Sequence, residues 1–445
     1  MSEHGSRSIV IVGGGATGVI LAAHLVKAGL QDRITLIEKR DAVGAGLAYS
    51  TRLPEHRLNV PASRMGAYAD DPLHFWHWYC RTHVDAAGDG DIFLPRGTFG
   101  RYLSDLFAGL LAGTAGRLRR VTNECVNVVP LSGGFDVQLA DGTSIPANMV
   151  FLATGHDPDP APPMPFATRL CAEETPTVHP GERVVILGSG LSMIDAWLAL
   201  EAHGHRGEIV AVSRRGLFPL PHGEKRNPIL LDAADIPLGT ELSYFVRWFA
   251  ALVAERERAG GDWRDVVDGL RPFNQMIWQN WPISAKRRFL EHTRARWDIH
   301  RHRIPPDIHA RAGAAVAAGR LRLVAGKVTG VTKDAEGLAL SLRKRGSSEI
   351  VTIRCGHIYD CTGFTKDIGA TAMEPVRSLL ARGTVRPDPL RIGLEVTPDC
   401  MVIGVNGRPT PGLYACGPLT RGTFFEIDAV AEIRHQCARI AAALN

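Results

Sequence analysis

The stretch Ile9-Val10-Ile11-Val12-Gly13-Gly14-Gly15-Ala16-Thr17-Gly18 decides the fold of this chain. Its β-branched residues predict a short buried strand, and the three glycines at 13, 15 and 18 follow with the spacing G-x-G-x-x-G. The first glycine of such a turn allows the tight bend, the second lets a pyrophosphate approach, and the third lets the helix pack against the strand. A helix predicted over Val19–Ala28, ending before Gly29, would offer its first N–H groups to phosphate. The stretch therefore predicts a dinucleotide-binding βαβ unit.

An acidic residue at the end of the next predicted strand supports this interpretation over a chance glycine-rich turn. Strand Ile34–Ile37 ends in Glu38, about 20 residues after Gly18, where an acid accepts hydrogen bonds from ribose hydroxyls. A carboxylate there disfavours a 2′-phosphate. We expect this first site to take FAD or NAD and not NADP.

A second strand and glycine turn occur at Arg183–Leu187 and Gly188-Ser189-Gly190-Leu191-Ser192-Met193. Met193 replaces the third glycine, so either the helix stands further from the strand or the motif is an imitation of the first. The following strand, Glu208–Val212, ends in Ser213-Arg214-Arg215 and not in an acid. Guanidinium groups bind phosphate bidentately, which favours NADPH over NADH; the alternative is two solvated arginines at a strand end.

Composition limits the class of protein. A length of 445 residues allows more than one domain, and 45% hydrophobic with 22% charged residues is typical of a globular protein. The net charge of +5 is too small to predict a nucleic-acid partner, and no charge-free apolar run is long enough to predict a membrane span. Eight cysteines without a CxxC pair, and no signal-like N-terminus, lead us to expect a cytoplasmic protein. Homo-oligomerisation is left open.

A strand followed by a threonine–glycine turn occurs twice. Strand Met149–Leu152 ends in Ala153-Thr154-Gly155, and strand His357–Asp360 ends in Cys361-Thr362-Gly363. Two similar copies indicate two similarly built domains. The proline-rich stretch 157–165 is the predicted linker between them.

These motifs resemble those of the two-dinucleotide-binding flavoproteins, which include flavin monooxygenases, N-hydroxylating monooxygenases and disulfide reductases. The chain is most similar to the bacterial FAD–NAD(P)-binding protein family, through Gly44–Thr51, Leu58–Ala62 and Gly417–Thr423. The resemblance implies an α/β fold with two Rossmann-like dinucleotide-binding domains, a glutathione-reductase-like FAD fold and a helical insertion. The expected parts are an FAD-binding domain at 1–165, an NADP-binding domain at 180–354 with its insertion at about 236–312, and a returning part of the FAD domain at 355–445.

The resemblance implies FAD at the first site and NADPH at the second. Pro418 stands where many relatives have an Asp that holds the ribityl chain, so we expect backbone groups near Thr423 to replace it. A helix predicted from Glu426 would point its positive end at the flavin. The expected cofactor-binding residues around the first turn are Gly13, Gly15, Ala16, Thr17, Gly18, Glu38, Lys39, Gly46, Leu47, Val126, Thr154, Gly155, Gly417, Pro418 and Thr423. Those around the second turn are Gly188, Gly190, Ser192, Ser213, Arg214 and Arg215.

Asn59 is the candidate catalytic residue and a further cofactor contact. Its side chain both donates and accepts hydrogen bonds, and the resemblance implies that the loop Leu58–Pro61 lies beside the isoalloxazine. The alternative is a turn residue held before Pro61.

The resemblance also implies a reaction. NADPH reduces FAD, the reduced flavin and O₂ form a C4a-(hydro)peroxide, and a small amine or amino acid is N-hydroxylated by a single-component monooxygenase. The flavin supplies the difficult chemistry, so no metal site is expected. The alternatives are an NAD(P)H:acceptor oxidoreductase without oxygen insertion and a non-catalytic flavoprotein. A disulfide reductase is disfavoured because no cysteine lies between residues 1 and 79.

The insertion is predicted to be helical. Leu242–Arg258 has apolar residues at helical spacing, and the tryptophans that follow are interpreted as core. The stretch His300-Arg301-His302-Arg303 is either an anion site or a basic segment that makes ion pairs and packs the insertion; a metal site lacks a convincing third ligand.

Overall fold

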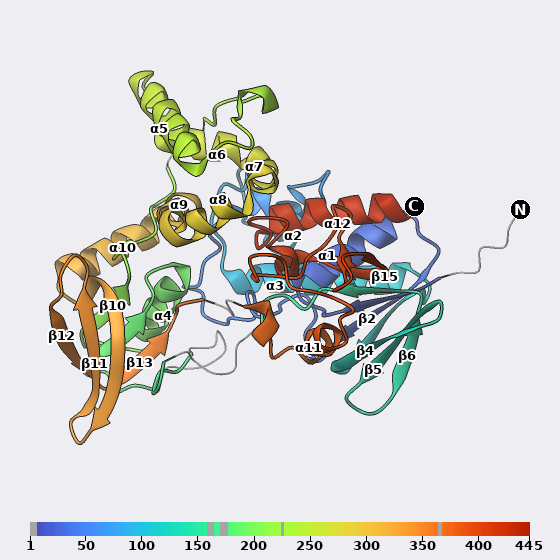
Figure 1. Cartoon of the computed structure of the whole chain (residues 1–445), viewed down its shortest axis with the longest axis horizontal. Coiled ribbons are helices and arrows are strands. Elements are labelled where there is room, and N and C mark those ends of the chain that lie inside the picture. The colour runs from blue at the N-terminus through green and yellow to red at the C-terminus, as the bar shows by residue number, and fades with distance from the viewer. Residues whose placement is uncertain (1–6, 158–163, 170–176, 224–226, 364–366) are drawn as a thin grey trace, which may run out of the picture. The chain divides into compact units, whose positions relative to one another are not determined.

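The computed structural model describes residues 7–157, 164–169, 177–223, 227–363 and 367–445 (Figure 1). The chain forms two compact units. Unit 1 consists of Met1–Arg52, Val60–Asp159 and Phe364–Asn445, and unit 2 of Leu53–Asn59 and Pro160–Gly363. This α/β architecture confirms the predicted fold class.

Unit 1 is built on a six-stranded sheet with the order β14-β15-β7-β1-β2-β3. Five of its strands are parallel, namely β1 (Ser8–Val12), β2 (Arg33–Glu38), β3 (Leu118–Thr122), β7 (Met149–Leu152) and β15 (Pro409–Ala415). The edge strand β14 (Met401–Ile403) is antiparallel. Ile9, Val10 and Ile11 in β1 are fully buried, as expected for a parallel sheet covered on both faces.

Helices and a small second sheet cover the main sheet of unit 1. Helix α1 (Ala16–Lys27) packs against α3 (Arg96–Gly113) and α12 (Val430–Leu444), while β4 (Cys125–Leu131), β5 (Gly134–Leu139) and β6 (Ser144–Ala147) form an antiparallel sheet. Figure 1 shows α1 and α12 on one side of β2 and the β4–β6 sheet on the other. The remaining helices are α2 (His74–Thr82) and α11 (Glu374–Ala381), with short 3₁₀ turns at Ala62–Arg64, Ile368–Ala370 and Gly417–Thr420.

Unit 2 contains another six-stranded sheet, with the order β12-β11-β10-β9-β8-β13. Strands β8 (Val184–Leu187), β9 (Ile209–Ser213), β10 (Leu321–Asp334) and β13 (His357–Asp360) are parallel, and β11 (Gly337–Lys344) and β12 (Ile350–Cys355) extend the sheet as antiparallel strands. Helices α4 (Leu191–Ala202) and α10 (Pro306–Ala317) complete the βαβ units.

The insertion is helical, as predicted. It contains α5 (Leu242–Arg258), α6 (Trp263–Leu270), α7 (Asn274–Asn280), α8 (Ile283–Arg288) and α9 (Arg294–Arg301), with 3₁₀ turns at Ala233–Asp235 and Arg271–Phe273 and a π-helical turn at Phe289–Thr293. Trp278 and Trp281 are buried, which confirms the core interpretation for these two. No helix in the described ranges is long and apolar enough to cross a membrane.

Three predicted boundaries are wrong. The chain returns to unit 1 after Gly363 and not at residue 355, because β13 pairs in parallel with β8 and completes the sheet of unit 2. The segment Leu53–Asn59 belongs to unit 2 although it was expected in the first domain. The last helix begins at Val430 and not at Glu426, because Glu426 has a left-handed backbone with φ +60°. Of the predicted linker, residues 158–163 lie outside the described residues.

Candidate dinucleotide sites

The first glycine turn lies where the carboxyl ends of four neighbouring parallel strands meet. Strands β15, β7, β1 and β2 are adjacent in the sheet of unit 1. Their ends lead into Gly417, Thr154, Gly13 and Glu38 respectively. Residues predicted from four distant parts of the sequence are thereby brought to one edge of the sheet, which is the edge where open α/β sheets bind their ligands.

Two glycines of the first motif are required by close packing. Gly13 has φ +106°, and a Cβ atom there would lie 2.5 Å from the carbonyl oxygen of Ala153. A Cβ atom at Gly18 would lie 1.9 Å from the carbonyl oxygen of Gly13. The structure thus gives Gly13 and Gly18 the turn and packing roles that the motif predicted.

Glu38 faces the glycine turn. The backbone N–H of Gly14 donates to its Oε2 at 2.8 Å, and that of Arg40 donates to its Oε1 at 2.9 Å. A carboxylate oxygen accepts more than one hydrogen bond, so both oxygens retain capacity for ribose hydroxyls. The negative charge beside the turn opposes a 2′-phosphate.

The glycine loop after β2 crosses the turn. The N–H of Gly44 donates to the carbonyl oxygen of Gly14 at 2.7 Å, and a Cβ atom at Gly46 would lie 3.4 Å from the Cα atom of Gly15. The Arg40 guanidinium donates to the carbonyl oxygen of Gly46 at 2.9 Å and holds the loop in place. Sequence reasoning missed Arg40, whose only signal is its position two residues after Glu38. Leu47, in the same loop, is exposed.

The tail after β15 packs onto the start of α1. A Cβ atom at Gly417 would lie 2.6 Å from Oγ1 of Thr17, which follows Ala16, the first residue of α1. The N–H of Gly417 donates to Oε1 of the buried Gln436 at 2.7 Å. Pro418 is buried in the following 3₁₀ turn, and the N–H of Thr423 donates to the carbonyl oxygen of Thr420 at 3.0 Å. These contacts fix the tail beside the helix terminus that was expected to face the cofactor.

The other expected residues of the first site differ in environment. The Oγ1 atom of Thr154 is buried without a hydrogen-bond partner among the described residues, so it could bond to a bound group; Gly155 follows with φ +74°. Lys39 forms an exposed ion pair with Glu124 at 2.8 Å. Val126 lies at an irregularity in the pairing of β4 with β5. Direct contacts from these residues to a cofactor stay predictions.

The second glycine turn repeats the first with one difference. Gly188 has φ +107°, and a Cβ atom there would lie 2.3 Å from the carbonyl oxygen of Cys361. A Cβ atom at Gly13 would meet the carbonyl oxygen of Ala153 in the same way. A Cβ atom at Gly190 would meet nothing within 4 Å, which leaves space for a ligand at the start of α4. Ser192 lies in the first turn of that helix.

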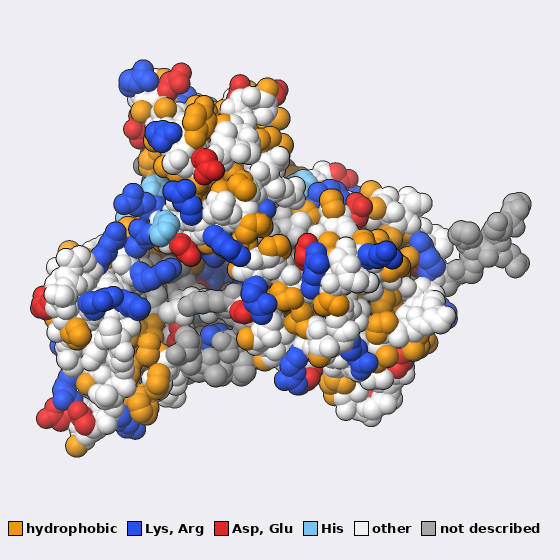
Figure 2. Space-filling model, viewed as in Figure 1, with side chains coloured by type: hydrophobic (Ala, Val, Ile, Leu, Met, Phe, Trp, Pro, Cys, Tyr) orange, Lys and Arg blue, Asp and Glu red, His pale blue; other side chains and the backbone are white. Residues whose placement is uncertain are grey.

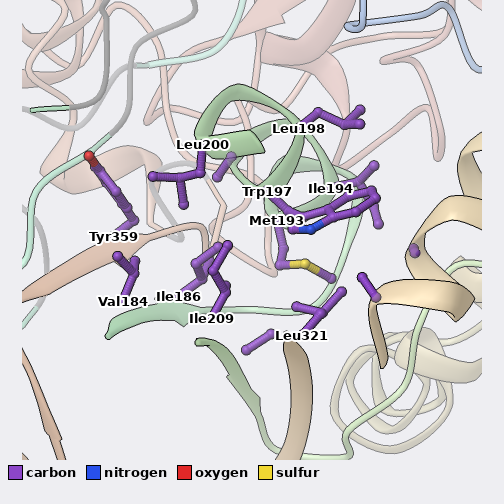
Figure 3. Close-up of a cluster of buried hydrophobic side chains, with 14 of the residues drawn as sticks. Val184, Ile186, Met193, Ile194, Trp197, Leu198, Leu200, Ile209, Leu321 and Tyr359 are labelled. Carbon is purple, nitrogen blue, oxygen red and sulfur yellow. The ribbon is translucent and has the colours of Figure 1, made fainter. Parts of the chain in front are cut away.

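Met193, at the position of the third glycine, is a core residue. Its side chain is fully buried in a cluster that includes Ile186, Trp197, Ile209 and Leu321, and Figure 3 shows it reaching from α4 toward Leu321. Helix α4 is therefore held against its sheet by side-chain packing. Helix α1, in contrast, is held by the close approach of Gly18 to Gly13.

Arginines follow β9 where an acid follows β2. The Ser213 hydroxyl accepts from the N–H of Gly216 at 2.9 Å and bonds to the Ser189 hydroxyl at 2.8 Å, which closes the turn. Arg214 is exposed. Arg215 donates from Nη2 to the carbonyl oxygen of His292 at 2.6 Å. The turn thus carries positive charge and has no acid at the position that corresponds to Glu38.

Asn59 is the last residue of the segment Leu53–Asn59, which belongs to unit 2. The carbonyl oxygen of Asn59 is 2.9 Å from Nε2 of His222, and Nε2 of the buried His56 is 3.0 Å from the carbonyl oxygen of Asp195 in α4. The segment is therefore bonded beside the second glycine turn. Neither histidine was singled out from the sequence, because nothing local marks a ring that bonds a distant carbonyl.

The basic stretch of the insertion makes ion pairs. Arg303 is buried and pairs with the buried side chain of Asp268, while His300 lies edge-on against Trp263. These contacts support the packing interpretation. Within the described ranges, no group of three histidine, cysteine or acidic side chains could hold a metal ion.

Comparison with known proteins finds a family match to part of the sequence and a likeness in fold over the whole chain. Residues 10–157 match the family described as FAD-NAD(P)-binding. No curated protein matches the sequence. In fold, the chain is similar to the ornithine N-hydroxylase of Kutzneria sp. 744 (TM-score 0.65, 16% identity), the L-lysine 6-monooxygenase of Pseudomonas syringae (0.63, 16%) and the bacillithiol disulfide reductase of Bacillus cereus (0.55, 16%), each over 99% of both chains. Residues 10–157 therefore match an FAD–NAD(P)-binding family model, and the whole chain shares its fold with these solved structures.

Proposed function

We propose that this protein is an FAD-dependent, NADPH-using monooxygenase that N-hydroxylates a small amine or amino acid. The observation that carries the proposal is the difference between the two glycine turns. Glu38 faces the first turn, whereas Arg214 and Arg215 follow the strand beside the second. Two dinucleotide sites whose side chains carry opposite charge suit two different dinucleotides, one an electron donor and the other an electron carrier.

The residues of unit 1 fit FAD. The glycine turn has the spacing that suits a pyrophosphate, Glu38 has acceptor capacity for ribose hydroxyls, and the Thr154 hydroxyl is unbonded within the described part of the chain. When bound, FAD would supply hydride acceptance and reaction with O₂. The work of the chain is then to bind, to orient and to exclude water.

The residues of unit 2 fit NADPH. The space beside Gly190 admits a pyrophosphate to the start of α4, and the arginines after β9 suit a 2′-phosphate. Asn59, in the segment bonded to α4 through His56, is our candidate for a side chain that contacts the nicotinamide or the flavin.

Disulfide reduction is disfavoured at Cys355 and Cys361 by the pKa values of their thiols. Burial and the charges of Asp195 and Asp360 raise the pKa of the Cys361 thiol to about 12. Burial and the charge of Glu182 raise that of Cys355 to about 11. A redox-active thiol requires a lowered pKa, so neither suits that chemistry. The structures named N-hydroxylase and 6-monooxygenase support the nitrogen substrate.

The purified, FAD-loaded protein tests the proposal. It should oxidise NADPH in air, and an amine or amino acid from a panel should give hydroxylamine product in proportion to the NADPH used. Rapid anaerobic turnover with a quinone and no oxygenated product would instead indicate an acceptor reductase. Failure of NADPH to bleach the flavin would indicate a non-catalytic flavoprotein.

A further inference from the structure

Four arginines gather at the carboxyl end of β9. Arg214 and Arg215 directly follow the strand. Arg345 follows β11, and Arg296 belongs to α9 of the helical insertion. Figure 2 shows Lys and Arg side chains concentrated over α9, α10 and the neighbouring end of the β10–β12 sheet.

Backbone contacts bring these segments together. Arg215 donates to the carbonyl oxygen of His292, in the π-helical turn immediately before α9. The N–H of Arg345 donates to the carbonyl oxygen of Ala325 at 3.0 Å, and Ala325 is paired with Ser213 in the register of β10 and β9. The insertion and the β11–β12 turn are thus both fixed at the strand end that carries Arg214 and Arg215.

These arginines differ from their neighbours in lacking acidic partners. Arg294 pairs with Asp298 at 3.3 Å, Arg322 with Glu208 at 2.8 Å and Arg354 with Asp334 at 2.9 Å. Among the described residues, no carboxylate forms an ion pair with any of the four. Partial desolvation and the like charges of Arg345, Arg296 and Arg214 lower the pKa of Arg215. Uncompensated like charges at one place favour a bound anion.

We infer that Arg296 and Arg345 join Arg214 and Arg215 in one site for the 2′-phosphate of NADPH. The inference rests on the proposed use of NADPH. It adds that the phosphate is bound in part by residues outside the dinucleotide fold, and that the insertion contributes to cofactor selection through α9. A phosphate monoester carries up to two negative charges and presents three acceptor oxygens, which several guanidinium groups share through charge-assisted hydrogen bonds.

Calorimetry on the FAD-loaded protein tests the inference without relying on turnover. The probes are 2′,5′-ADP and 5′-AMP, which differ by the 2′-phosphate. Arg296→Ala and Arg345→Ala should each weaken 2′,5′-ADP binding by about tenfold, the loss expected for one hydrogen bond to a charged group, and should leave 5′-AMP binding unchanged. Arg296→Lys should recover part of the loss. Arg294→Ala is the matched control, because Arg294 lies on the same helix and pairs with Asp298.

The outcomes separate the two proposals. Preference of the wild type for 2′,5′-ADP that survives both substitutions would overturn the role of Arg296 and Arg345 while leaving NADPH use intact. Equal affinity of the wild type for the two probes would overturn the phosphate site altogether. A selective loss in both variants supports the site, even if no hydroxylated product is ever found.

Discussion

The Nε2 atom of His222 lies 2.9 Å from the backbone carbonyl oxygen of Asn59. This contact joins two residues that are far apart in sequence within unit 2. Since the backbone position of Asn59 determines where its side chain can point, His222 is expected to act as a positioning residue for Asn59.

Substitution of His222 tests this positioning role. His222→Ala should slow reduction of the flavin by NADPH about tenfold, the effect of losing one hydrogen bond of roughly 1.4 kcal/mol, with FAD content unchanged. His222→Gln, which can still donate, should restore much of the rate. His203→Ala is the control, because, among the described residues, the His203 ring bonds only the carbonyl oxygen of Ala199 in the preceding helix. Equal rates in wild type and His222→Ala, measured by anaerobic stopped flow, would contradict the role.

Asn59→Asp tests whether the candidate catalytic residue must donate a hydrogen bond as well as accept one. The change keeps the shape of the side chain and removes its N–H donor. We expect NADPH oxidation to continue while the hydroxylated product falls and hydrogen peroxide rises, because an unsupported oxygenated flavin would decay. The ratio of product to NADPH measures this coupling. Unchanged coupling in Asn59→Asp would show that donation from Asn59 is not needed.

Glu38→Ala should weaken FAD binding. The substitution leaves the N–H of Gly14 without its partner and removes the expected acceptor for ribose, a loss of about 1–3 kcal/mol or roughly ten- to hundredfold in Kd. Reconstitution of the apoprotein, followed by flavin fluorescence, gives the Kd. Asp70→Ala is the control, because Asp70 forms an exposed ion pair with Lys27 in the same unit. A Kd equal to that of the wild type would remove Glu38 from the FAD site.

Arg214→Ala should raise the KM for NADPH about tenfold or more, since a hydrogen bond between charged groups is lost, and should leave the KM for NADH nearly unchanged. Initial-rate measurements with both nucleotides provide the comparison. An equal effect on the two would place Arg214 elsewhere than at the 2′-phosphate.

Met193→Gly would complete the second glycine motif yet should destabilise unit 2. Removing a fully buried side chain from the cluster around Trp197 should lower the free energy of unfolding by about 2–5 kcal/mol, with a further loss of about 1 kcal/mol from glycine in a helix. Denaturant unfolding followed by tryptophan fluorescence reports the change. Val316→Ala, at an exposed position in α10, should have little effect. A variant as stable as the wild type would show that Met193 does not hold α4.

Local patterns predicted the parts of the fold that local forces determine. The glycine turns at Gly13 and Gly188, and the residues Glu38 and Arg214 at the strand ends, follow from short-range rules of strand, turn and helix. The boundary after Gly363 could not be predicted, because the strand His357–Asp360 resembles Met149–Leu152 and its sequence does not say which sheet it joins. Pairing with β8 decides it.

Residues whose roles depend on tertiary contacts could not be predicted from the sequence either. The segments that carry Arg296 and Arg345 are joined to the end of β9 by the bonds Arg215–His292 and Arg345–Ala325. His56 and His222 bond backbone carbonyls far along the chain. Met193 departs from the glycine motif, and only the core around it explains how the helix is accommodated.

We propose above that the reduced protein inserts oxygen into its substrate. The most direct test mixes the NADPH-reduced, FAD-loaded protein with O₂ in a stopped-flow spectrometer and records flavin absorbance. The proposal predicts an oxygenated flavin species, distinct in absorbance from reduced and oxidised flavin, that forms before reoxidation and decays faster with the substrate amine. Direct return to oxidised flavin without such a species, at a rate independent of any amine, would contradict it.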